Sequence, residues 1–353
     1  MDRRQEHSER QDRQRLQALV ARGVRARWWR RQGSKQRGFR YVDLQGQPVQ
    51  DEKQLERIRS LSLPPAWKEV RIAPSPRSRL QAVGVDTSGR IQYRYQEQYV
   101  ARQARKKYAK IERFGEALPQ LRRLTNAHLA LAGLPRERVL AVIVRLIDHL
   151  FFRLGSEKSV RQYRTYGITT LRNRHLEILP AGELRFHFIG KHHVRQKRLY
   201  VDPELAALLT EVKALRGSHL FQYLDENGRA HPVTPGDVNR YIKAAIGPEY
   251  SAKDFRTWGG TLLAAIALAK MDRPENEAQM RRRIVEANKR VAAQLGNTPT
   301  VCRECYIHPI VFDRYRAGIT LADFPIRPRR VIPGCQPDYT PEEQALLQLF
   351  HAV

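Results

Sequence analysis

The hydrophobic pattern of this chain changes at Gln96, and this change constrains the fold more than any other feature. Segments between residues 38 and 95 alternate apolar and polar residues or carry β-branched and aromatic residues, as strands do. After Gln96, apolar residues recur at helical spacing. We therefore predict an α+β protein, with a basic arm and a small β-rich domain over 1–100 and a larger, mainly α-helical domain over 101–353.

The front domain is expected to contain four strands, in the segments GFRYVD, EVRIAP, LQAVGVD and RIQYRY. Turn sequences separate them, and QDEKQLERIRSL predicts one short helix. Residues 1–40 are rich in arginine and predict a helical or partly disordered arm. Its cations either face solvent or bind phosphates. The packed part is expected to begin at Trp28 and Trp29.

The second domain begins with helices and continues with a small antiparallel sheet. PRERVLAVIVRLIDHLFFRLG is amphipathic and predicts a helix that ends before Gly155, with Arg153 in its last turn. The segments TYGITTL, HLEIL, LRFHFIG and RLYVD predict strands. Alternation should place Leu184, Phe186 and Phe188 on one face, and Lys191 in the turn that follows.

The remaining helices have marked start signals. A capping box begins one helix at Thr234, and another helix starts over Ser251–Asp254 and carries Arg256 in its first turns. Thr298 and Pro299 cap a short helix that carries Tyr306. Further helices are expected over residues 203–216, over residues 274–295, and, as a docking helix within a C-terminal tail, from Thr340.

The charge balance indicates a polyanionic partner. Lys and Arg number 64 against 36 Asp and Glu, a formal net charge of +28. Nucleic acid is the commonest partner of so basic a protein, and an anionic membrane is the alternative. No apolar stretch is long enough to span a membrane, and the first residues lack the apolar core of a signal peptide. We expect a cytoplasmic, nucleoid-associated protein that binds double-stranded DNA.

The few cysteines and the lack of a phosphate-binding loop motif favour a protein without a cofactor. Three cysteines are too few for a disulfide framework, and Cys302 and Cys305 lack a second CxxC pair for zinc. Packing is the favoured interpretation of this pair over a redox or metal role. The chain contains no GxxxxGK[ST] loop and no DxD pair. We predict no metal and no nucleotide cofactor.

Five residues in four segments suggest a phosphoryl-transfer site. Tyr306 supplies a phenol that can attack a phosphodiester, while the planar guanidiniums of Arg153 and Arg256 can bind its nonbridging oxygens. An ammonium among other cations can protonate a departing sugar oxygen, and Lys191 is the candidate. Asn297 can donate a further hydrogen bond to phosphate.

Each of these residues taken singly has an ordinary structural explanation, and only their combination is informative. Tyr306 can serve as a core residue and Arg153 as a helix C-terminal charge. Arg256 can pair with Asp254 or contact a DNA phosphate without a catalytic role, and Lys191 can be an ordinary turn residue.

The combination resembles the type IB DNA topoisomerases, in particular the poxvirus-like enzymes and their bacterial relatives, over residues 35–320. The matching segments are Arg153 with Gly167 in TYGITTLRNRHLEI, FIGK ending at Lys191, KDFRTWG around Arg256, and GNTP followed by Cys-Tyr306. The resemblance implies the fold shared with tyrosine recombinases, relaxation of supercoiled DNA by a monomer, and a 3′-phosphotyrosyl intermediate.

The resemblance also covers the front domain, where PPAWKEVRIAP and AVGVDTSGRIQYRY look like the DNA-clamping β domain of this family. It implies DNA contacts at Gln92, Tyr93 and Tyr95, and we add Arg90 and Lys253 as candidates. The alternative is an ordinary alternating strand whose aromatic side chains lie in the core.

The sequence departs from the pattern of this family at one position, and two other functions compete with topoisomerase activity. Poxvirus and nuclear members carry histidine where this chain has Asn297, which can donate a hydrogen bond but cannot carry a proton. A tyrosine recombinase shares the chemistry, but recombinases usually show HxxR where this chain has Lys253 before Arg256. A non-catalytic basic architectural protein would explain the charge without the site.

Overall fold

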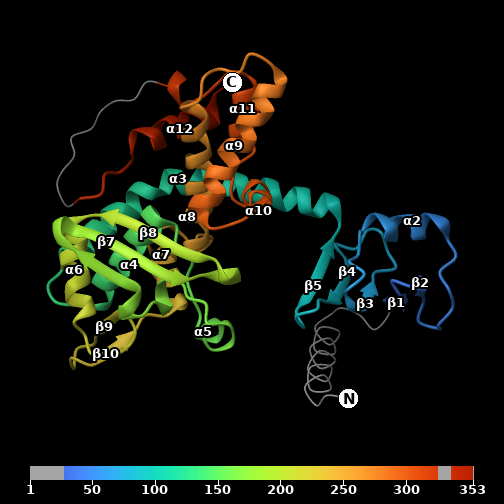
Figure 1. Ribbon diagram of the computed structural model, residues 1–353, viewed down its shortest axis with the longest axis horizontal. Coiled ribbons are helices and arrows are strands. Elements are labelled where there is room, and N and C mark those ends of the chain that lie inside the picture. The colour runs from blue at the N-terminus through green and yellow to red at the C-terminus, as the bar shows by residue number, and fades with distance from the viewer. Residues whose placement is uncertain (1–27, 325–334, 353) are drawn as a thin grey trace. The chain divides into compact units, whose positions relative to one another are not determined.

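The computed structural model describes residues 28–324 and 335–352 (Figure 1). Of the predicted arm over residues 1–40, residues 1–27 lie outside them. The chain divides into two compact units, and the boundary follows Lys107, inside a long helix α3 (Glu97–Leu129). Strands fill the first unit and helices with small sheets fill the second, so the α+β prediction is confirmed. Among the described helices, none has the length and apolar character needed to cross a membrane.

The first unit is built on one five-stranded antiparallel sheet with the order β2-β1-β3-β4-β5. Its elements are β1 (Trp29–Ser34), β2 (Gly38–Val42), α2 (Glu52–Ser60), β3 (Lys68–Ile72), β4 (Leu80–Val85) and β5 (Ile91–Tyr95). The four predicted strands and the short helix are confirmed. Strand β1 was not predicted, although the packed part was expected to begin at Trp28 and Trp29; it forms because it pairs with both β2 and β3.

The core of the first unit is small. Its fully buried members are Ile58 from α2, Val70 and Ile72 from β3, and Ala82 from β4. Asp51 caps α2 by accepting hydrogen bonds from two backbone N–H groups of the first turn. Strand β5 lies at the edge of the sheet and leads directly into α3.

The helices of the second unit pack around one large hydrophobic core. After α3 they are α4 (Arg136–Leu150), α5 (Glu157–Tyr163), α6 (Pro203–Lys213), α7 (Pro235–Ile246), α8 (Ala252–Ala269), α9 (Glu277–Leu295), α10 (Pro299–Cys305), α11 (Ile310–Arg316) and α12 (Pro341–His351). The capping box predicted at Thr234 is present, and α8 starts after Ser251 as predicted, where the Ser251 N–H donates to the Asp254 carboxylate at 2.8 Å. Helix α9 starts later than predicted because Asn276 accepts a hydrogen bond from the Gln279 N–H and caps it.

Two small antiparallel sheets complete this unit. Strands β6 (Leu176–Leu179), β7 (Glu183–Ile189) and β8 (Arg195–Val201) form the first, with β7 in the middle, and β9 (Gln222–Leu224) pairs with β10 (Ala230–Pro232). Leu184, Phe186 and Phe188 of β7 are all buried, as predicted. The predicted strand in TYGITTL is wrong: Ile168–Thr170 forms a 3-10 turn closed by the Thr170 side chain.

Helix α12 docks on the helical core through buried charges, which confirms the predicted docking helix. Arg122 of α3 donates to Asp148 of α4 at 2.9 Å and to Glu343 of α12 at 2.6 Å. The indole of Trp258 in α8 donates to Glu343 at 3.0 Å. The three charged side chains are at most 6% exposed, so this network ties four helices together in a region without water to screen it.

Candidate active site

Arg153 lies beyond the end of α4, and its predicted place in the last helical turn is wrong. The helix ends at Leu150 because Phe151 adopts a left-handed conformation with φ of 54°. A non-glycine residue in that region is strained and persists only where its surroundings hold it. The Phe151 ring packs so tightly against Gly259 of α8 that a methyl group there would lie 2.0 Å from a ring atom. Because the sequence has phenylalanine and not glycine at position 151, it gives no local signal that α4 ends there.

The segment that carries Arg153 is held in place by the turn at Gly167. The Ile168 N–H donates to the Arg153 carbonyl at 2.8 Å, and the Gly155 N–H donates to the Thr169 hydroxyl at 3.2 Å. A methyl group on Gly167 would lie 2.0 Å from the Leu154 carbonyl oxygen, so only glycine permits this approach. The spacing between Arg153 and Gly167 therefore has a structural cause.

Arg256 is 4% exposed and is held by two backbone carbonyls. Its guanidinium donates to the Phe151 carbonyl and, at 2.7 Å, to the Leu295 carbonyl, while its buried Nε has no partner among the residues that the structure describes. Burial and then the nearby charge of Arg153 lower the pKa of Arg256 to about 10, while the Tyr306 phenol acts in the opposite direction. Burying such a cation is unfavourable unless an anion joins it. Arg256 does not pair with Asp254, which instead pairs with Lys110 at 2.6 Å.

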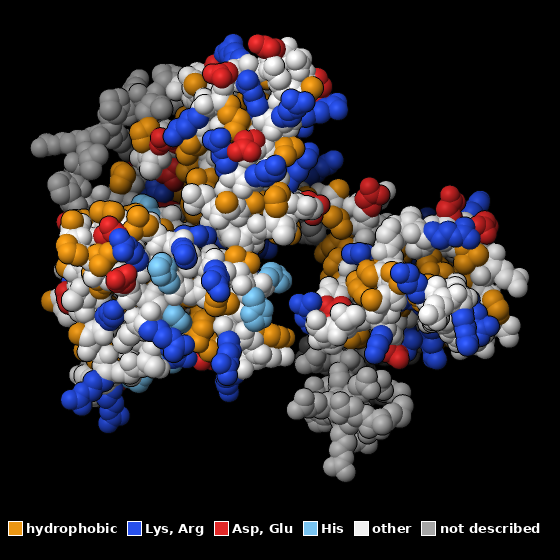
Figure 2. Space-filling view, in the orientation of Figure 1, with side chains coloured by type: hydrophobic (Ala, Val, Ile, Leu, Met, Phe, Trp, Pro, Cys, Tyr) orange, Lys and Arg blue, Asp and Glu red, His pale blue; other side chains and the backbone are white. Residues whose placement is uncertain are grey.

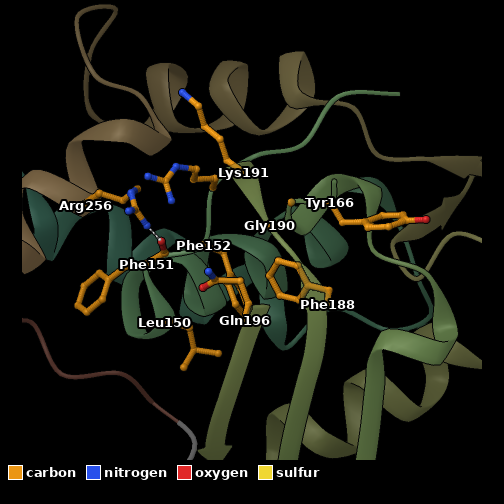
Figure 3. A pocket seen from close by; sticks show the side chains of 11 residues that line it. Leu150, Phe151, Phe152, Tyr166, Phe188, Gly190, Lys191, Gln196 and Arg256 are labelled. Carbon is orange, nitrogen blue, oxygen red and sulfur yellow. Dashed lines mark hydrogen bonds between the residues drawn. The ribbon is translucent and has the colours of Figure 1, made fainter. Parts of the chain in front are cut away.

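Lys191 lies in the turn between β7 and β8, as predicted, and is exposed. The two residues after it, His192 and His193, have φ of 61° and 58°, so this turn is a tight left-handed one. One pocket is lined by Arg153, Lys191 and Arg256 together. Figure 3 shows Arg256 against the Phe151 carbonyl, while the Lys191 side chain extends away from that contact.

Asn297 follows the end of α9 and contacts Arg153, which lines the pocket. That helix stops because Gly296 adopts a left-handed conformation with φ of 61°. The Asn297 carbonyl oxygen accepts a hydrogen bond from the Arg153 guanidinium. Among the described residues, its buried amide nitrogen has no oxygen acceptor and faces only the Cys302 thiol, a weak acceptor. A buried donor without an oxygen acceptor is costly, so this nitrogen is available to an incoming phosphate oxygen.

Tyr306 follows α10 and forms its C-cap, so the predicted short helix is present but ends one residue before the tyrosine. The Arg256 guanidinium carbon lies 5.0 Å from the centre of the Tyr306 ring, within the range of a cation–π contact. Cys302 is buried and burial raises the pKa of its thiol, which favours the packing interpretation of this cysteine. Thus Tyr306 and Asn297 adjoin the pocket through the two arginines.

Two adjacent glycines of α8 bring these parts together, and sequence reasoning did not identify them. Gly259 makes room for the Phe151 ring next to Arg153. A methyl group on Gly260 would lie 2.6 Å from the Tyr306 carbonyl oxygen. Paired glycines inside an otherwise helical pattern were the available signal, because such residues weaken a helix unless close packing requires them.

Substitution of Gly260 by alanine is expected to slow any reaction of Tyr306 by about 100-fold, because the added methyl group must push the tyrosine backbone away. The measurement is single-turnover formation of the protein–DNA adduct. Gly236→Ala in α7 is the matched control, since its methyl group would have ordinary contacts. Equal rates for the two variants would contradict this packing argument.

The predicted DNA contacts on β5 divide between its two faces. Tyr93 and Tyr95 are 40% and 45% exposed, and their rings stack with centres 6.1 Å apart. Gln92 is on the opposite face of the strand and donates to Asp86 at 2.8 Å. Arg90 also donates to Asp86, at 3.0 Å. In the second unit, Lys253 is exposed at the start of α8.

Comparison with known proteins identifies the family. Residues 96–322 match the family of the eukaryotic DNA topoisomerase I catalytic core, and residues 38–86 match the bacterial DNA topoisomerase IB N-terminal domain. DNA topoisomerase 1B of Acanthamoeba polyphaga mimivirus is 32% identical over 276 residues, covering 75% of this chain and 80% of the viral protein.

Shorter matches extend to other organisms. DNA topoisomerase 1B of vaccinia virus (strain Copenhagen) is 30% identical over 117 residues, or 33% of this chain and 37% of the viral protein. DNA topoisomerase 1 of Mycosarcoma maydis is 26% identical over 225 residues, which cover 56% of this chain and 22% of the fungal protein. The catalytic-core match includes all five residues of the candidate site, and the chain belongs to the type IB DNA topoisomerase family.

Proposed function

We propose that this type IB topoisomerase relaxes supercoiled duplex DNA as a monomer, in the cytoplasm and in association with the nucleoid, without a nucleotide or a metal cofactor. In this proposal residues 1–100 hold the DNA and residues 101–353 cleave it. The observation that carries the proposal is the pocket lined by Arg153, Lys191 and Arg256, with Tyr306 5.0 Å from the Arg256 guanidinium.

The proposed reaction exchanges one ester for another. The Tyr306 phenol gives its proton to water and its oxygen attacks the scissile phosphorus, so that a 3′-phosphotyrosyl bond forms as the bond to the 5′ oxygen breaks. Arg153 and Arg256 bind the nonbridging oxygens, where charge develops in the transition state. Lys191 gives the departing 5′ oxygen its proton. After the cut strand rotates about the intact one, the 5′-hydroxyl attacks the ester and reseals the strand.

Asn297 has a narrower role in this proposal. Its carbonyl oxygen is occupied by Arg153, so its amide nitrogen, which has no oxygen acceptor among the described residues, is the atom that donates to a phosphate oxygen. An amide does not exchange protons at neutral pH, so Asn297 stabilises the transition state by hydrogen bonding alone. Proton transfer falls to Lys191.

Relaxation of a supercoiled plasmid in EDTA without ATP tests the proposal. We expect full relaxation by the wild-type protein, because ester exchange conserves the bond energy and needs no nucleotide. Denaturant added during the reaction should trap the protein on the 3′ side of the nick. An inactive wild-type protein, or an adduct on the 5′ side, would contradict the proposal.

The rival function is strand transfer by a tyrosine recombinase, which uses the same ester chemistry. A synapsis assay distinguishes the two, because a recombinase joins two DNA sites in a multimer. We expect relaxation at a rate proportional to protein concentration and no joined products. Joined products from two labelled duplexes would favour the recombinase.

A further inference from the structure

A second pocket, distinct from the catalytic one, lies beside the β7–β8 hairpin and has a volume of about 410 Å³. We call it the basic pocket, because four of its lining residues are the cations Arg164, Arg174, Arg195 and Lys197. None of the five catalytic candidates lines it. Figure 2 shows Lys, Arg and His side chains gathered over the part of the second unit where β7, β8 and α5 lie.

The four cations lack carboxylate partners within the part of the chain that the structure describes, residues 28–324 and 335–352. Neighbouring arginines are neutralised: Arg172 pairs with Glu157 at 3.3 Å, and Arg185 of β7 pairs with Glu183 at 2.5 Å. Like charges held together without an anion repel one another, and this cost is recovered when a polyanion binds.

The cations come from three segments that face one cavity. Arg195 and Lys197 alternate along β8 and lie opposite Ile189 and His187 of β7. Arg174 donates to the Tyr166 hydroxyl at 3.3 Å, which directs its guanidinium along the same wall. The exposed cations therefore line the cavity from three segments, so several of them can bind the acceptor oxygens of one phosphate.

His175 in the pocket wall adds no charge. Burial, followed by the charges of Arg174 and Arg172, lowers its pKa to about 4, and its Nδ1 accepts from the Arg172 N–H at 3.0 Å. With Tyr166, Phe188 and Ile189, this neutral ring gives the basic pocket an apolar side. Cations next to an apolar wall suit a sugar-phosphate unit better than an isolated inorganic ion.

The basic pocket and the catalytic pocket share a wall formed by Tyr166, Phe188 and Gln196. We propose that the basic pocket binds a backbone phosphate of the same DNA duplex, on one side of the scissile phosphate. This inference rests on the proposed function, because it assigns a second contact to the same substrate. The contact adds affinity and fixes the position of the DNA, and it takes no part in the chemistry.

The test is the double variant Arg195→Ala, Lys197→Ala, with binding of a fluorescent DNA duplex measured by anisotropy from low to high salt. We expect Kd to rise about tenfold at physiological salt and the slope of log K against log salt to flatten by about 1, because each lost phosphate contact contributes about 0.9. Single-turnover cleavage at saturating DNA should stay at the wild-type rate, since the catalytic residues are untouched.

The matched control is Arg185→Ala, Arg281→Ala, which removes the same net charge from arginines paired with Glu183 and Glu277. We expect it to keep the wild-type slope. A wild-type slope in the pocket variant, an equal change in the control, or loss of cleavage at saturating DNA would each overturn the inference. Binding is measured separately from relaxation. A failure of this inference therefore does not contradict the proposed function, which the plasmid relaxation assay tests.

Discussion

Replacement of Tyr306 by phenylalanine is expected to abolish plasmid relaxation, with a loss on the order of 10⁴-fold or more, because no oxygen remains to form the ester with phosphorus. The ring and its contact with Arg256 are retained, so the fold and DNA binding should be preserved. The measurements are plasmid relaxation, adduct trapping with denaturant, and Kd for duplex DNA.

Tyr315 of α11 provides the control for this substitution. It is 4% exposed, and its hydroxyl has no hydrogen-bond partner among the described residues, so Tyr315→Phe removes an oxygen at little cost. We expect this variant to relax DNA at the wild-type rate. Relaxation by Tyr306→Phe at a comparable rate would show that another residue is the nucleophile.

Replacement of Arg122 by methionine is expected to destabilise the helical unit by about 3–5 kcal/mol, because two buried carboxylates, Asp148 and Glu343, lose their shared cation. The melting temperature of this unit should fall on the order of 10 °C. Differential scanning calorimetry measures both quantities. The effect should include release of α12, since Glu343 is its buried anchor on α3 and α8.

The adjacent Arg123 separates loss of the buried network from loss of charge. It pairs with Asp338 at 3.0 Å, but its side chain is 69% exposed and screened by solvent. We therefore expect Arg123→Met to leave the melting temperature almost unchanged. Similar melting temperatures for the two variants would contradict a stabilising role of the buried network.

Local signals predicted most elements correctly where the chain provides its own caps and periodicity. Helices start after Thr234 and Ser251 as expected, since the capping side chains and the backbone groups that they bind are only three residues apart. The prediction fails at Phe151 and in TYGITTL. The conformation of Phe151 depends on the space beside Gly259, which is remote in the sequence. The turn in TYGITTL depends on the close approach of Gly167 to the Leu154 carbonyl, which belongs to another turn.

In the candidate site, too, the residues could be predicted from the sequence but the contacts between remote residues could not. Residue types and order were sufficient to select Tyr306, Arg153, Lys191, Arg256 and Asn297, because phosphoryl transfer needs a nucleophile, fixed cations and an acid. Contacts across the fold could not be predicted in this way. The Arg256 bonds to the Phe151 and Leu295 carbonyls and the Arg153 bond to Asn297 join segments far apart in the chain.

The sequence alone therefore determined the fold class, the family and the chemical groups available, because these depend on composition, periodicity and short motifs. Only the tertiary structure decided which atoms of those groups remain free. Arg256 is held by carbonyls with its Nε buried, and within the described part of the chain the Asn297 nitrogen has no oxygen acceptor. The basic pocket is also tertiary, because its cations come from separate segments and their lack of carboxylate partners depends on how the described chain packs.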